Sequence, residues 1–514
     1  MTGTKVTGRT RIICSLTATS ATEMRRDMFD AAAVGADAVE LRLDYLQIPP
    51  GRQEIADLLA DAPVETIVTC RPTAEGGKFT GPESDRLAIL ANAVRLGANW
   101  VDVEADVTPH YRPAPAGRII LSRHDFKRCP PDLDAIAARL DGSETAVNKI
   151  TFAAAGPEDA LRAFDVLRKC HKPTLVLAMG HAGVISRILA GKFGAFGTFA
   201  ALAAGKESAP GQPTVRELTD LYRVKTLTPA SAVYGVIGCP IAHSMSPAIH
   251  NAAFRAVGLD GLYVPLLIQP GAEPFNRFLT ALLERPWLDW RGLSVTIPHK
   301  ENALNFVEAG NCDELAGRIG AVNTITITRG TGGRAVLRGD NTDYAAAIDS
   351  LCQAMGMARE GLAGRAVAVL GAGGAARAIV AALAHYGAAT TIYNRTVARG
   401  RKLAQEFAAR SAGLDDLDRL RAEIIINCTP IGMHPKVQAS PLERIPPGTK
   451  VVFDTIYNPI QTLLLAQARR SGCLTVSGLD MFVNQAAAQF EIWTGRPAPR
   501  ETMRQVVVER LGGR

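Results

Sequence analysis

Eight short apolar runs rich in β-branched residues recur along the first 200 residues, and helix-length amphipathic stretches separate most of them. The runs begin at positions 11, 38, 65, 100, 118, 146, 174 and 193. Neighbouring parallel strands need a crossover connection, usually a helix, so this alternation predicts a parallel sheet. Eight such units in about 220 residues predict a closed (β/α)8 barrel, an α/β fold whose chemistry lies at the carboxyl ends of its strands.

The stretch KTLTPASAVYG at 225–235 shows little hydrophobic periodicity, and we place a domain boundary there. A different sequence pattern follows it. From position 362 the segment LAGRAVAVLGAGGAARAIVAALAHYG reads as a strand, a glycine turn and a helix, and ATTIYNR reads as the next strand. This order is the opening unit of a doubly wound, Rossmann-like dinucleotide-binding domain.

Composition narrows the classes of partner. No apolar run reaches the length of a membrane span, and the N-terminus lacks the apolar core of a signal peptide, so we expect a cytoplasmic protein. Nine cysteines form no CxxC pair, and no histidine cluster has metal spacing, so we expect free thiols and no metal. The net charge of +7 without a Lys/Arg block argues against nucleic-acid or membrane partners and suits small anionic substrates.

Lys149 stands in the middle of AVNKITF, where a barrel strand normally carries a branched apolar residue. Burying an ammonium is costly unless it is paired or becomes neutral, and a neutral amine is a nucleophile. Such an amine can attack a ketone and form a protonated Schiff base, which acidifies the neighbouring C–H bond. The alternative is that Lys149 points outward beneath a helix, with its ammonium reaching water.

Other barrel motifs place polar residues at predicted strand ends. His124 in SRHDF is a candidate for proton transfer near neutral pH, and Glu75 in AEGG is a candidate for orienting its imidazole. Each candidate residue has an alternative reading as one half of an ordinary ion pair. The remaining candidates for holding a carboxylate and hydroxyls are Glu40, Arg42, Arg71, Arg187 and the segment SAPGQ at 208–212.

Seven of these motifs, in this order, resemble those of type I 3-dehydroquinate dehydratases over residues 10–215: VELRLD, CRPTAEGG, SRHDF, NKITF, MGHAGVISR, FGAFGTFA and SAPGQ. The resemblance implies dehydration of 3-dehydroquinate to 3-dehydroshikimate without a cofactor. It implies that Lys149 forms the Schiff base, that His124 moves the protons and that Glu75 positions His124. The positions that match substrate-binding residues of the family are Glu40, Arg42, Arg71, Arg187, Ser208 and Gln212.

The segment GAGGAARA carries small residues at the three fingerprint positions, Gly371, Gly373 and Ala376. Small residues allow a pyrophosphate to approach the free N–H groups at the start of a helix. Where an NAD-binding domain usually has an acidic residue, this sequence has Arg395, flanked by Asn394 and Thr396. A cation there favours a 2′-phosphate and so predicts NADP(H). The alternative is a solvated arginine at a strand end.

Three further motifs supply polar groups before the fingerprint. GCPIAHSMSP offers the hydroxyls of Ser244 and Ser246, SVTIPHK delivers Lys300, and GDNTD delivers Asp343. A lysine and a carboxylate that meet in a cleft can exchange a proton with an alcohol while a hydride leaves its carbon. An ordinary salt bridge is the alternative reading of this pair.

Residues 233–500 resemble shikimate dehydrogenases through these motifs and through GAVNT, NRT, NCTPIGM, DTIYNP and SGLDMFVNQAAAQFEIWTG. The resemblance implies NADP-dependent reduction of 3-dehydroshikimate to shikimate, with Lys300 and Asp343 as the catalytic pair. The implied substrate-binding positions are Ser244, Ser246, Thr296, Asn323, Tyr457 and Gln485. The implied cofactor-binding positions are Gly371, Ala372, Gly373, Gly374, Ala375, Asn394, Arg395, Thr396, Asn427, Thr429, Met433 and Gly478.

The two resemblances together predict a fused enzyme, because the product of the first reaction is the substrate of the second. The expected division is a dehydratase barrel at 1–226, a substrate-binding domain at 231–345, an NADP-binding domain at 346–476 and a C-terminal helical segment at 477–514. Ser294 and Ala346 depart from the Asn and Gly usual in the second family. Two alternatives remain: a second half that acts on quinate, and a ligand sensor without turnover. The presence of all five catalytic candidates favours turnover.

Overall fold

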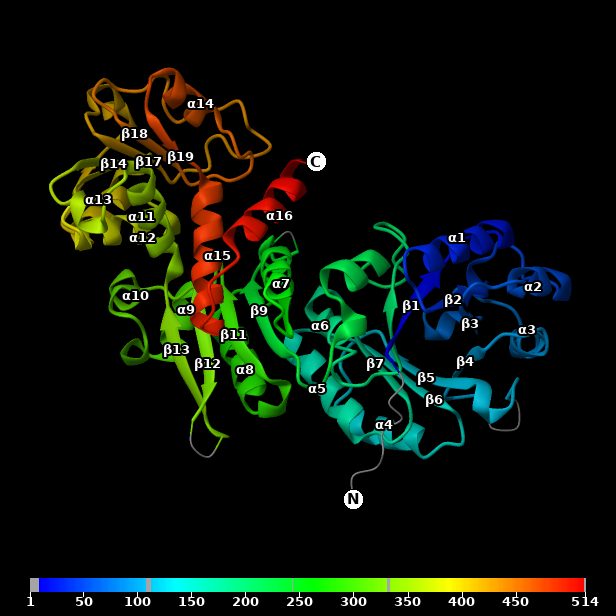
Figure 1. The fold of residues 1–514 in the computed structure, drawn as a ribbon. Coiled ribbons are helices and arrows are strands. Elements are labelled where there is room, and N and C mark those ends of the chain that lie inside the picture. Colours follow the sequence, from blue (N-terminus) through cyan, green and yellow to red (C-terminus); the bar gives the residue numbers. More distant parts are fainter. Residues whose placement is uncertain (1–8, 108–111, 243, 331–332, 513–514) are drawn as a thin grey trace. The chain divides into compact units, whose positions relative to one another are not determined.

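The computed structural model describes residues 9–107, 112–242, 244–330 and 333–512. Two compact units make up the chain. The first contains residues 1–244 and 260–290, and the second contains residues 245–259 and 291–514. Both units are of the α/β class (Figure 1). The finer division into four domains stays a prediction.

The first unit begins with an eight-stranded parallel sheet, in which all eight expected strands occur. Ladder pairing runs in the order β7-β6-β5-β4-β3-β2-β1-β8. The strands are β1 (Arg11–Leu16), β2 (Ala38–Arg42), β3 (Glu65–Thr69), β4 (Trp100–Glu104), β5 (Ile119–Asp125), β6 (Val147–Ala153), β7 (Thr174–Met179) and β8 (Gly197–Ala200). The connecting helices are α1 (Ala21–Ala33), α2 (Arg52–Leu59), α3 (Glu83–Arg95), α4 (Leu133–Asp141), α5 (Pro157–Lys169) and α6 (Ile185–Ile188).

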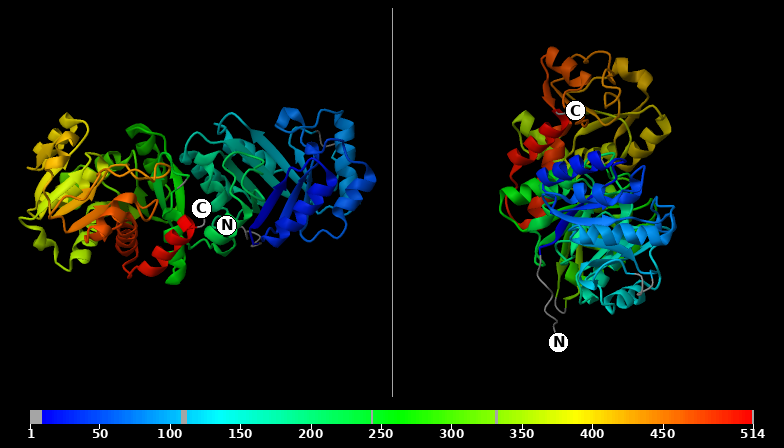
Figure 2. Two further views of the ribbon diagram at one scale, coloured as in Figure 1. Left: turned by 90° about the horizontal axis from the view of Figure 1, so that it is seen from above. Right: turned by 90° about the vertical axis from the view of Figure 1, so that its right-hand side faces the viewer.

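The barrel is nearly rather than fully closed. No β7–β8 ladder forms among the described residues, and the two strands meet through a hydrogen bond from the Phe196 N–H to the Thr174 carbonyl, 2.9 Å long. All four residues of β8 pair instead with β1. Inward-facing apolar residues such as Ile13, Ile67 and Leu175 fill the interior, and helices surround the strands (Figure 2). The carboxyl ends of the strands therefore share one face.

The first unit also includes β9 (Ala232–Gly238), β10 (Gly261–Leu267) and α8 (Ala272–Leu283), with β9 and β10 paired in parallel. In the second unit, β11 (Trp290–Val295), β12 (Thr324–Arg329) and β13 (Ala335–Asp340) form antiparallel pairs. Its nearby helices are α7 (Ser246–Ala256), α9 (Lys300–Val307) and α10 (Glu314–Ile319).

The dinucleotide-type fold of the second unit is a six-stranded parallel sheet in the order β16-β15-β14-β17-β18-β19. This is the doubly wound order, with its switch point between β14 and β17. Its strands are β14 (Ala366–Leu370), β15 (Ala389–Tyr393), β16 (Arg410–Ala412), β17 (Ile424–Asn427), β18 (Val451–Asp454) and β19 (Leu474–Val476). Its helices are α11 (Thr342–Met355), α12 (Gly374–His385), α13 (Val397–Glu406) and α14 (Leu463–Arg470), and the chain ends with α15 (Gly478–Thr494) and α16 (Arg500–Gly512).

Apolar side chains point alternately to the two faces of the sheet along β14, and helices cover both faces. Val367 and Val369 pack into one apolar cluster with residues of α11, α12 and α13. Ala368 and Leu370 pack into another with residues of α14. A strand buried on both faces reads as a continuous apolar run, as the sequence RAVAVL does. Among the described residues, no helix is both long enough and apolar enough to cross a membrane.

Candidate functional site

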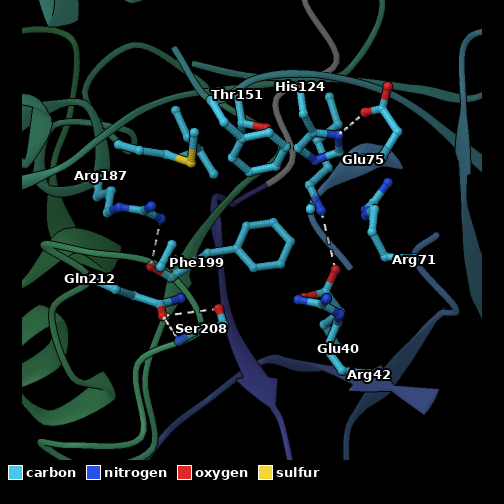
Figure 3. Close-up of a pocket in the computed structure, with 16 residues that line it drawn as sticks. Glu40, Arg42, Arg71, Glu75, His124, Thr151, Arg187, Phe199, Ser208 and Gln212 are labelled. Atoms are coloured by element: carbon cyan, nitrogen blue, oxygen red, sulfur yellow. Dashed lines mark hydrogen bonds and ion pairs between the residues drawn. The ribbon is translucent and has the colours of Figure 1, made fainter. Parts of the chain in front are cut away.

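One pocket at the carboxyl end of the barrel strands collects every candidate residue of the first half (Figure 3). Figure 3 shows Arg187, Ser208 and Gln212 on one side and Glu40, Arg71 and His124 on the other. Nine predicted residues line the pocket: Glu40, Arg42, Arg71, Glu75, His124, Lys149, Arg187, Ser208 and Gln212. The other lining residues are Gly76, Phe126, Thr151, Leu177, Met179, Phe199 and Ala209.

Lys149 points into this pocket from β6 and is only 5% exposed. Its Nζ lies 2.7 Å from Asp102 Oδ2 and 3.2 Å from Glu40 Oε1, and 4.3 Å from the centre of the Phe199 ring. The outward-facing alternative for Lys149 is therefore wrong. A buried amine is either paired with an acid or neutral. In the structure Lys149 is paired, because the carboxylates of Glu40 and Asp102 flank its nitrogen.

The carboxylates beside Lys149 are themselves fully engaged. Glu40 accepts hydrogen bonds from the hydroxyls of Ser15 and Thr69, at 2.7 and 2.9 Å. Burial tends to raise the pKa of Glu40, but Lys149 and Arg42 outweigh it and lower that pKa below its usual value. Both carboxylates are consequently held in the charged form, and the site presents fixed negative charge to the amine nitrogen.

Asp102 was missed in the sequence. It is fully buried, and it also accepts a hydrogen bond of 2.6 Å from the Ser122 hydroxyl and forms an ion pair of 2.8 Å with Arg71. Burial opposes its charge, yet Arg71 and Lys149 together bring the pKa of Asp102 far below its ordinary value. The segment WVDVEA could have indicated Asp102, because Asp102 and Glu104 are two residues apart and therefore share one face of a strand.

His124 and Glu75 meet as predicted. His124 Nδ1 lies 3.1 Å from Glu75 Oε2. Burial, reinforced by the positive charges of Arg71 and Lys149, places the pKa of His124 well below its ordinary value. The imidazole is therefore neutral near neutral pH, and a carboxylate at Nδ1 favours the tautomer in which Nε2 accepts a proton.

Arg187 on α6 carries a buried charge with little local compensation. Its side chain is 2% exposed, its NH1 donates one long hydrogen bond of 3.4 Å to the Phe199 carbonyl, and its Nε has no partner among the described residues. Burial lowers the pKa of Arg187 to about 10. Nearby, the backbone N–H and hydroxyl of Ser208 both donate to Gln212 Oε1. This side of the pocket is therefore suited to an anionic group from outside the chain.

In the second unit, Lys300 and Asp343 also meet as predicted. Lys300 is the first residue of α9, and Asp343 lies in the first turn of α11. Lys300 Nζ is 2.5 Å from Asp343 Oδ2, and their side chains are 32% and 19% exposed. An ammonium at the N-terminus of a helix is unfavourable, and the Asp343 carboxylate offsets that cost.

Asn323 positions the element that carries Asp343. Its Oδ1 accepts from the Thr342 N–H at 2.8 Å and its Nδ2 donates to the Thr342 hydroxyl at 3.1 Å. Asn341 caps the same helix through the Asp343 N–H. The side chain of Asn323 thus contacts the start of α11, a use that the motif GAVNT did not indicate, and its role in substrate binding stays a prediction.

The other substrate-binding candidates occupy several elements. Gln485 donates to the Phe482 carbonyl within α15, and Tyr457 stacks on the Phe482 ring with centres 4.6 Å apart. Thr296 follows β11, and Ser246 begins α7, whereas Ser244 belongs to the first unit. Of the two departures from the family pattern, Ser294 donates to Gln489 Oε1 at 2.8 Å, and Ala346 is buried in α11.

The glycine turn after β14 forms a cradle suited to a dinucleotide. Gly371 has a φ of +106°, and a side chain there would approach the Cys428 carbonyl at 3.1 Å. Above Gly373 and Gly374, in contrast, an added Cβ would meet nothing within 4 Å. Ala372 lies in the turn, Gly373 caps α12, and Ala375 is the second residue of that helix. Open space at a helix N-terminus is a suitable site for a pyrophosphate.

The residues predicted around this cradle fall at the ends of neighbouring strands. Arg395 is exposed after β15, and Asn394 Nδ2 donates to the Thr396 carbonyl. Asn427, at the end of β17, accepts from the N–H and hydroxyl of Thr429 and so shapes the NCTP turn. Met433 is 47% exposed, and Gly478 packs where a Cβ would clash with the Ile456 backbone at 2.4 Å. The sequence analysis missed Arg399, a second exposed cation in the first turn of α13.

Comparison with known families gives four matches. Residues 12–229 match "Type I 3-dehydroquinase", 236–325 "Shikimate dehydrogenase substrate binding domain", 354–459 "Shikimate / quinate 5-dehydrogenase" and 478–508 "Shikimate 5'-dehydrogenase C-terminal domain".

Known proteins match along the whole chain and along its second half. The bifunctional 3-dehydroquinate dehydratase/shikimate dehydrogenase, chloroplastic, of Arabidopsis thaliana is 38% identical over 96% of this chain and 84% of its own length. A shikimate dehydrogenase (NADP(+)) of Methanosarcina acetivorans is 41% identical over 54% of this chain and 98% of its own. A solved structure, dehydroquinate dehydratase and shikimate dehydrogenase from S. pombe, is 25% identical over 98% of this chain and 99% of that one, with a TM-score of 0.45.

Proposed function

The chain belongs to the bifunctional 3-dehydroquinate dehydratase/shikimate dehydrogenases, and from that premise we propose which of its residues carry out each reaction. The first half dehydrates 3-dehydroquinate to 3-dehydroshikimate, and the second half reduces 3-dehydroshikimate to shikimate with NADPH. The observation that carries the assignment of residues is the placement of Lys149 between two buried carboxylates in a pocket that also holds an uncompensated Arg187.

In the dehydration, Lys149 Nζ transfers one proton to the substrate's ketone oxygen as it attacks the ketone carbon. The adduct then loses that oxygen as water and becomes a positively charged imine. Glu40 and Asp102, which flank the nitrogen, stabilise that charge. The imine draws electrons from the adjacent carbon, so neutral His124 removes a proton there, with Glu75 fixing its ring. The hydroxyl on the next carbon leaves with a proton returned by His124, and hydrolysis of the imine frees Lys149 and 3-dehydroshikimate.

Arg187 holds the substrate carboxylate in this scheme, and Ser208 and Gln212 hold hydroxyl groups. An Arg187→Met variant should have a KM for 3-dehydroquinate raised about 10²-fold, because it loses a desolvated charge pair with the ligand. Without ligand, the variant should unfold at a temperature no lower than the parent, because a buried charge without a carboxylate partner is removed. Steady-state kinetics measure the KM, and thermal unfolding measures the stability. A KM within about twofold of the parent contradicts the assignment of Arg187 to the substrate carboxylate.

The pH dependence of dehydration follows from His124. Because burial, Arg71 and Lys149 lower the pKa of His124 below its ordinary 6.5, its neutral, basic form persists at pH values below 6.5. The acid limb of kcat/KM for 3-dehydroquinate should therefore lie below the ordinary histidine value. A pH–rate profile of the dehydratase half reaction measures it. An acid limb at or above pH 6.5 would mean that a group other than this buried imidazole acts as the base.

In the reduction, NADPH supplies the hydride when it is bound. Lys300 gives a proton to the carbonyl oxygen as it becomes a hydroxyl, and Asp343 holds Lys300 in place. The remaining candidates, Ser244, Ser246, Thr296, Asn323, Tyr457 and Gln485, are proposed to bind the ring hydroxyls and the carboxylate. Arg395 and Arg399 are proposed to receive the 2′-phosphate, since both are exposed cations next to the cradle formed by Gly371–Gly374.

A coupled assay tests the whole proposal. Purified protein given 3-dehydroquinate and NADPH should oxidise NADPH, and it should do so with 3-dehydroshikimate as well. If NADPH is oxidised with 3-dehydroshikimate but not with 3-dehydroquinate, the barrel does not dehydrate 3-dehydroquinate. Rates on shikimate and quinate with NADP decide between the two acids, and faster turnover of shikimate is expected.

In the proposed domain division, residues 1–226 dehydrate 3-dehydroquinate, residues 231–345 bind the substrate of the reduction, and residues 346–476 bind NADP. Residues 477–514 form the C-terminal helical segment. The proposed partners are small anions rather than nucleic acid or a membrane, and the proposed location is the cytoplasm. Nine free thiols are consistent with a reducing compartment.

A further inference from the structure

Buried acidic and basic side chains alternate in one continuous series that starts at Lys149. Lys149 Nζ lies 2.7 Å from Asp102 Oδ2, and the same oxygen lies 2.8 Å from Arg71 NH2. Arg71 NH1 then lies 2.7 Å from Glu104 Oε1. Arg71 is 4% exposed and Glu104 is also 4% exposed. Asp102 therefore serves two cations at once, and Arg71 is fixed between two carboxylates.

The series continues away from the catalytic pocket, onto helix α3. Arg86 NH1 forms an ion pair of 2.7 Å with Glu104 Oε2 and also donates to the Cys70 carbonyl at 3.0 Å. Its Nε and NH2 donate to Glu83 at 2.7 and 2.6 Å. The Arg86 side chain is 1% exposed, whereas the Glu83 side chain is 54% exposed. Arg86 does not line the pocket that holds Lys149, but it lines a second cavity, beside Glu83 and Glu104.

The charge of Glu104 depends on both of its arginines. Burial raises the pKa of Glu104, while Arg71 and Arg86 favour its ionised form. Without Arg86, Glu104 would protonate more readily and would hold Arg71 less firmly. Arg71 would then be drawn toward Asp102, its remaining carboxylate, and compete with Lys149 for the same oxygen. A change on α3 can thus reach the amine nitrogen through four successive contacts.

We propose that Arg86 is a positioning residue for the dehydration: it anchors Glu104, which anchors Arg71, so that Asp102 remains available to Lys149. This inference rests on the proposed role of Lys149 as the Schiff-base residue. It extends the machinery of the reaction to a side chain that touches neither the pocket nor the substrate.

An Arg86→Met variant is the test, since Met keeps much of the side-chain volume without the charge. The expected result is a fall in kcat for 3-dehydroquinate of about tenfold, with KM changed by less than about threefold because Arg86 does not line the pocket. The acid limb of kcat should also move to higher pH, because protonation of Glu104 becomes easier. The charged groups that face Glu104 or line its cavity are Arg71, Asp102, Arg86, Glu75, Glu83 and Asp106.

Two matched variants separate positioning from simple support of the fold. Arg86→Lys restores a cation beside Glu104 and should recover most of kcat and of the acid limb. Glu83→Gln removes only the partly exposed outer partner of Arg86, and kcat should stay within about twofold of the parent. Turnover of 3-dehydroshikimate with NADPH in the same samples should be unchanged in all three variants.

Two results would overturn the inference. One is an Arg86→Met protein with parental kcat and parental pH profile. The other is a loss of activity that follows thermal stability, leaves the pH profile in place and is not recovered by Arg86→Lys, because that pattern belongs to a purely structural ion pair. If the parent protein itself fails to dehydrate 3-dehydroquinate, the proposed function fails first, and the variants are not needed to show it.

Discussion

A Lys149→Ala variant is expected to lose turnover of 3-dehydroquinate by about 10⁴-fold or more, the size of effect seen when an enzyme loses its covalent nucleophile. Reduction of 3-dehydroshikimate by NADPH should be unaffected, because Lys300 and Asp343 belong to the other compact unit. Loss of NADPH absorbance with each substrate measures both reactions in one preparation. The 3-dehydroshikimate reaction is the internal control for a folded chain.

A Lys149→Arg variant separates the nucleophile from the charge. Alanine leaves Glu40 and Asp102 without the cation between them, which is destabilising in its own right. Arginine keeps a cation there and forms no imine under these conditions. We expect both variants to be inactive, and borohydride with 3-dehydroquinate should add mass to the parent only. If Lys149→Arg turns over substrate or is trapped by borohydride, the imine forms elsewhere or not at all.

Strand positions in the barrel were predictable because they depend on local patterning. Each apolar run is short, rich in β-branched residues and followed by an amphipathic segment, and these features act over neighbouring residues. The opening strand, glycine turn and helix of the Rossmann-like sheet were predictable in the same way, whereas the order of its six strands is known from the structure. The eight-stranded barrel was predicted, but the missing ladder between β7 and β8 was not, because pairing between these two strands is not a property of the local sequence pattern.

The candidate site was predictable where residue type and strand position agree. Lys149 and His124 stand out because a polar residue in an apolar strand needs a partner, and the structure supplies Asp102 and Glu75. Which partner each would find depends on register between strands distant in sequence. Ser122 pairs across with Lys149, for example, and Glu104 with Ser122. The paired state of Lys149 and the part played by Arg86 on α3 were therefore beyond reach of the sequence alone.

Asn323 shows a different limit. The family resemblance predicts that Asn323 contacts the substrate, and this stays a prediction; the structure adds hydrogen bonds between its amide and Thr342, at the start of the helix that carries Asp343. A polar residue near a catalytic group can serve the group or the ligand, and the motif is the same in both cases. Only the hydrogen-bond partners separate the two.

A Lys300→Met variant should reduce kcat for 3-dehydroshikimate by about 10³-fold, within the range expected for losing a proton donor. The physical reason is that the developing alkoxide loses the ammonium that Asp343 holds at a distance of 2.5 Å from its carboxylate. Dehydration in the barrel should continue. Given 3-dehydroquinate and NADPH, the variant should therefore accumulate 3-dehydroshikimate, which chromatography of the quenched reaction quantifies.

An Asp343→Asn variant tests whether the two residues act as a unit. Asparagine keeps the shape of the side chain and leaves Lys300 without its counter-ion, so we expect a loss of about 10²-fold. If Asp343 works only by holding Lys300, the double variant should be no slower than Lys300→Met alone, because the second change removes nothing that still functions. Fully multiplicative losses would instead mean that Asp343 acts on the substrate independently, and the proposed pairing would then be only an ordinary salt bridge.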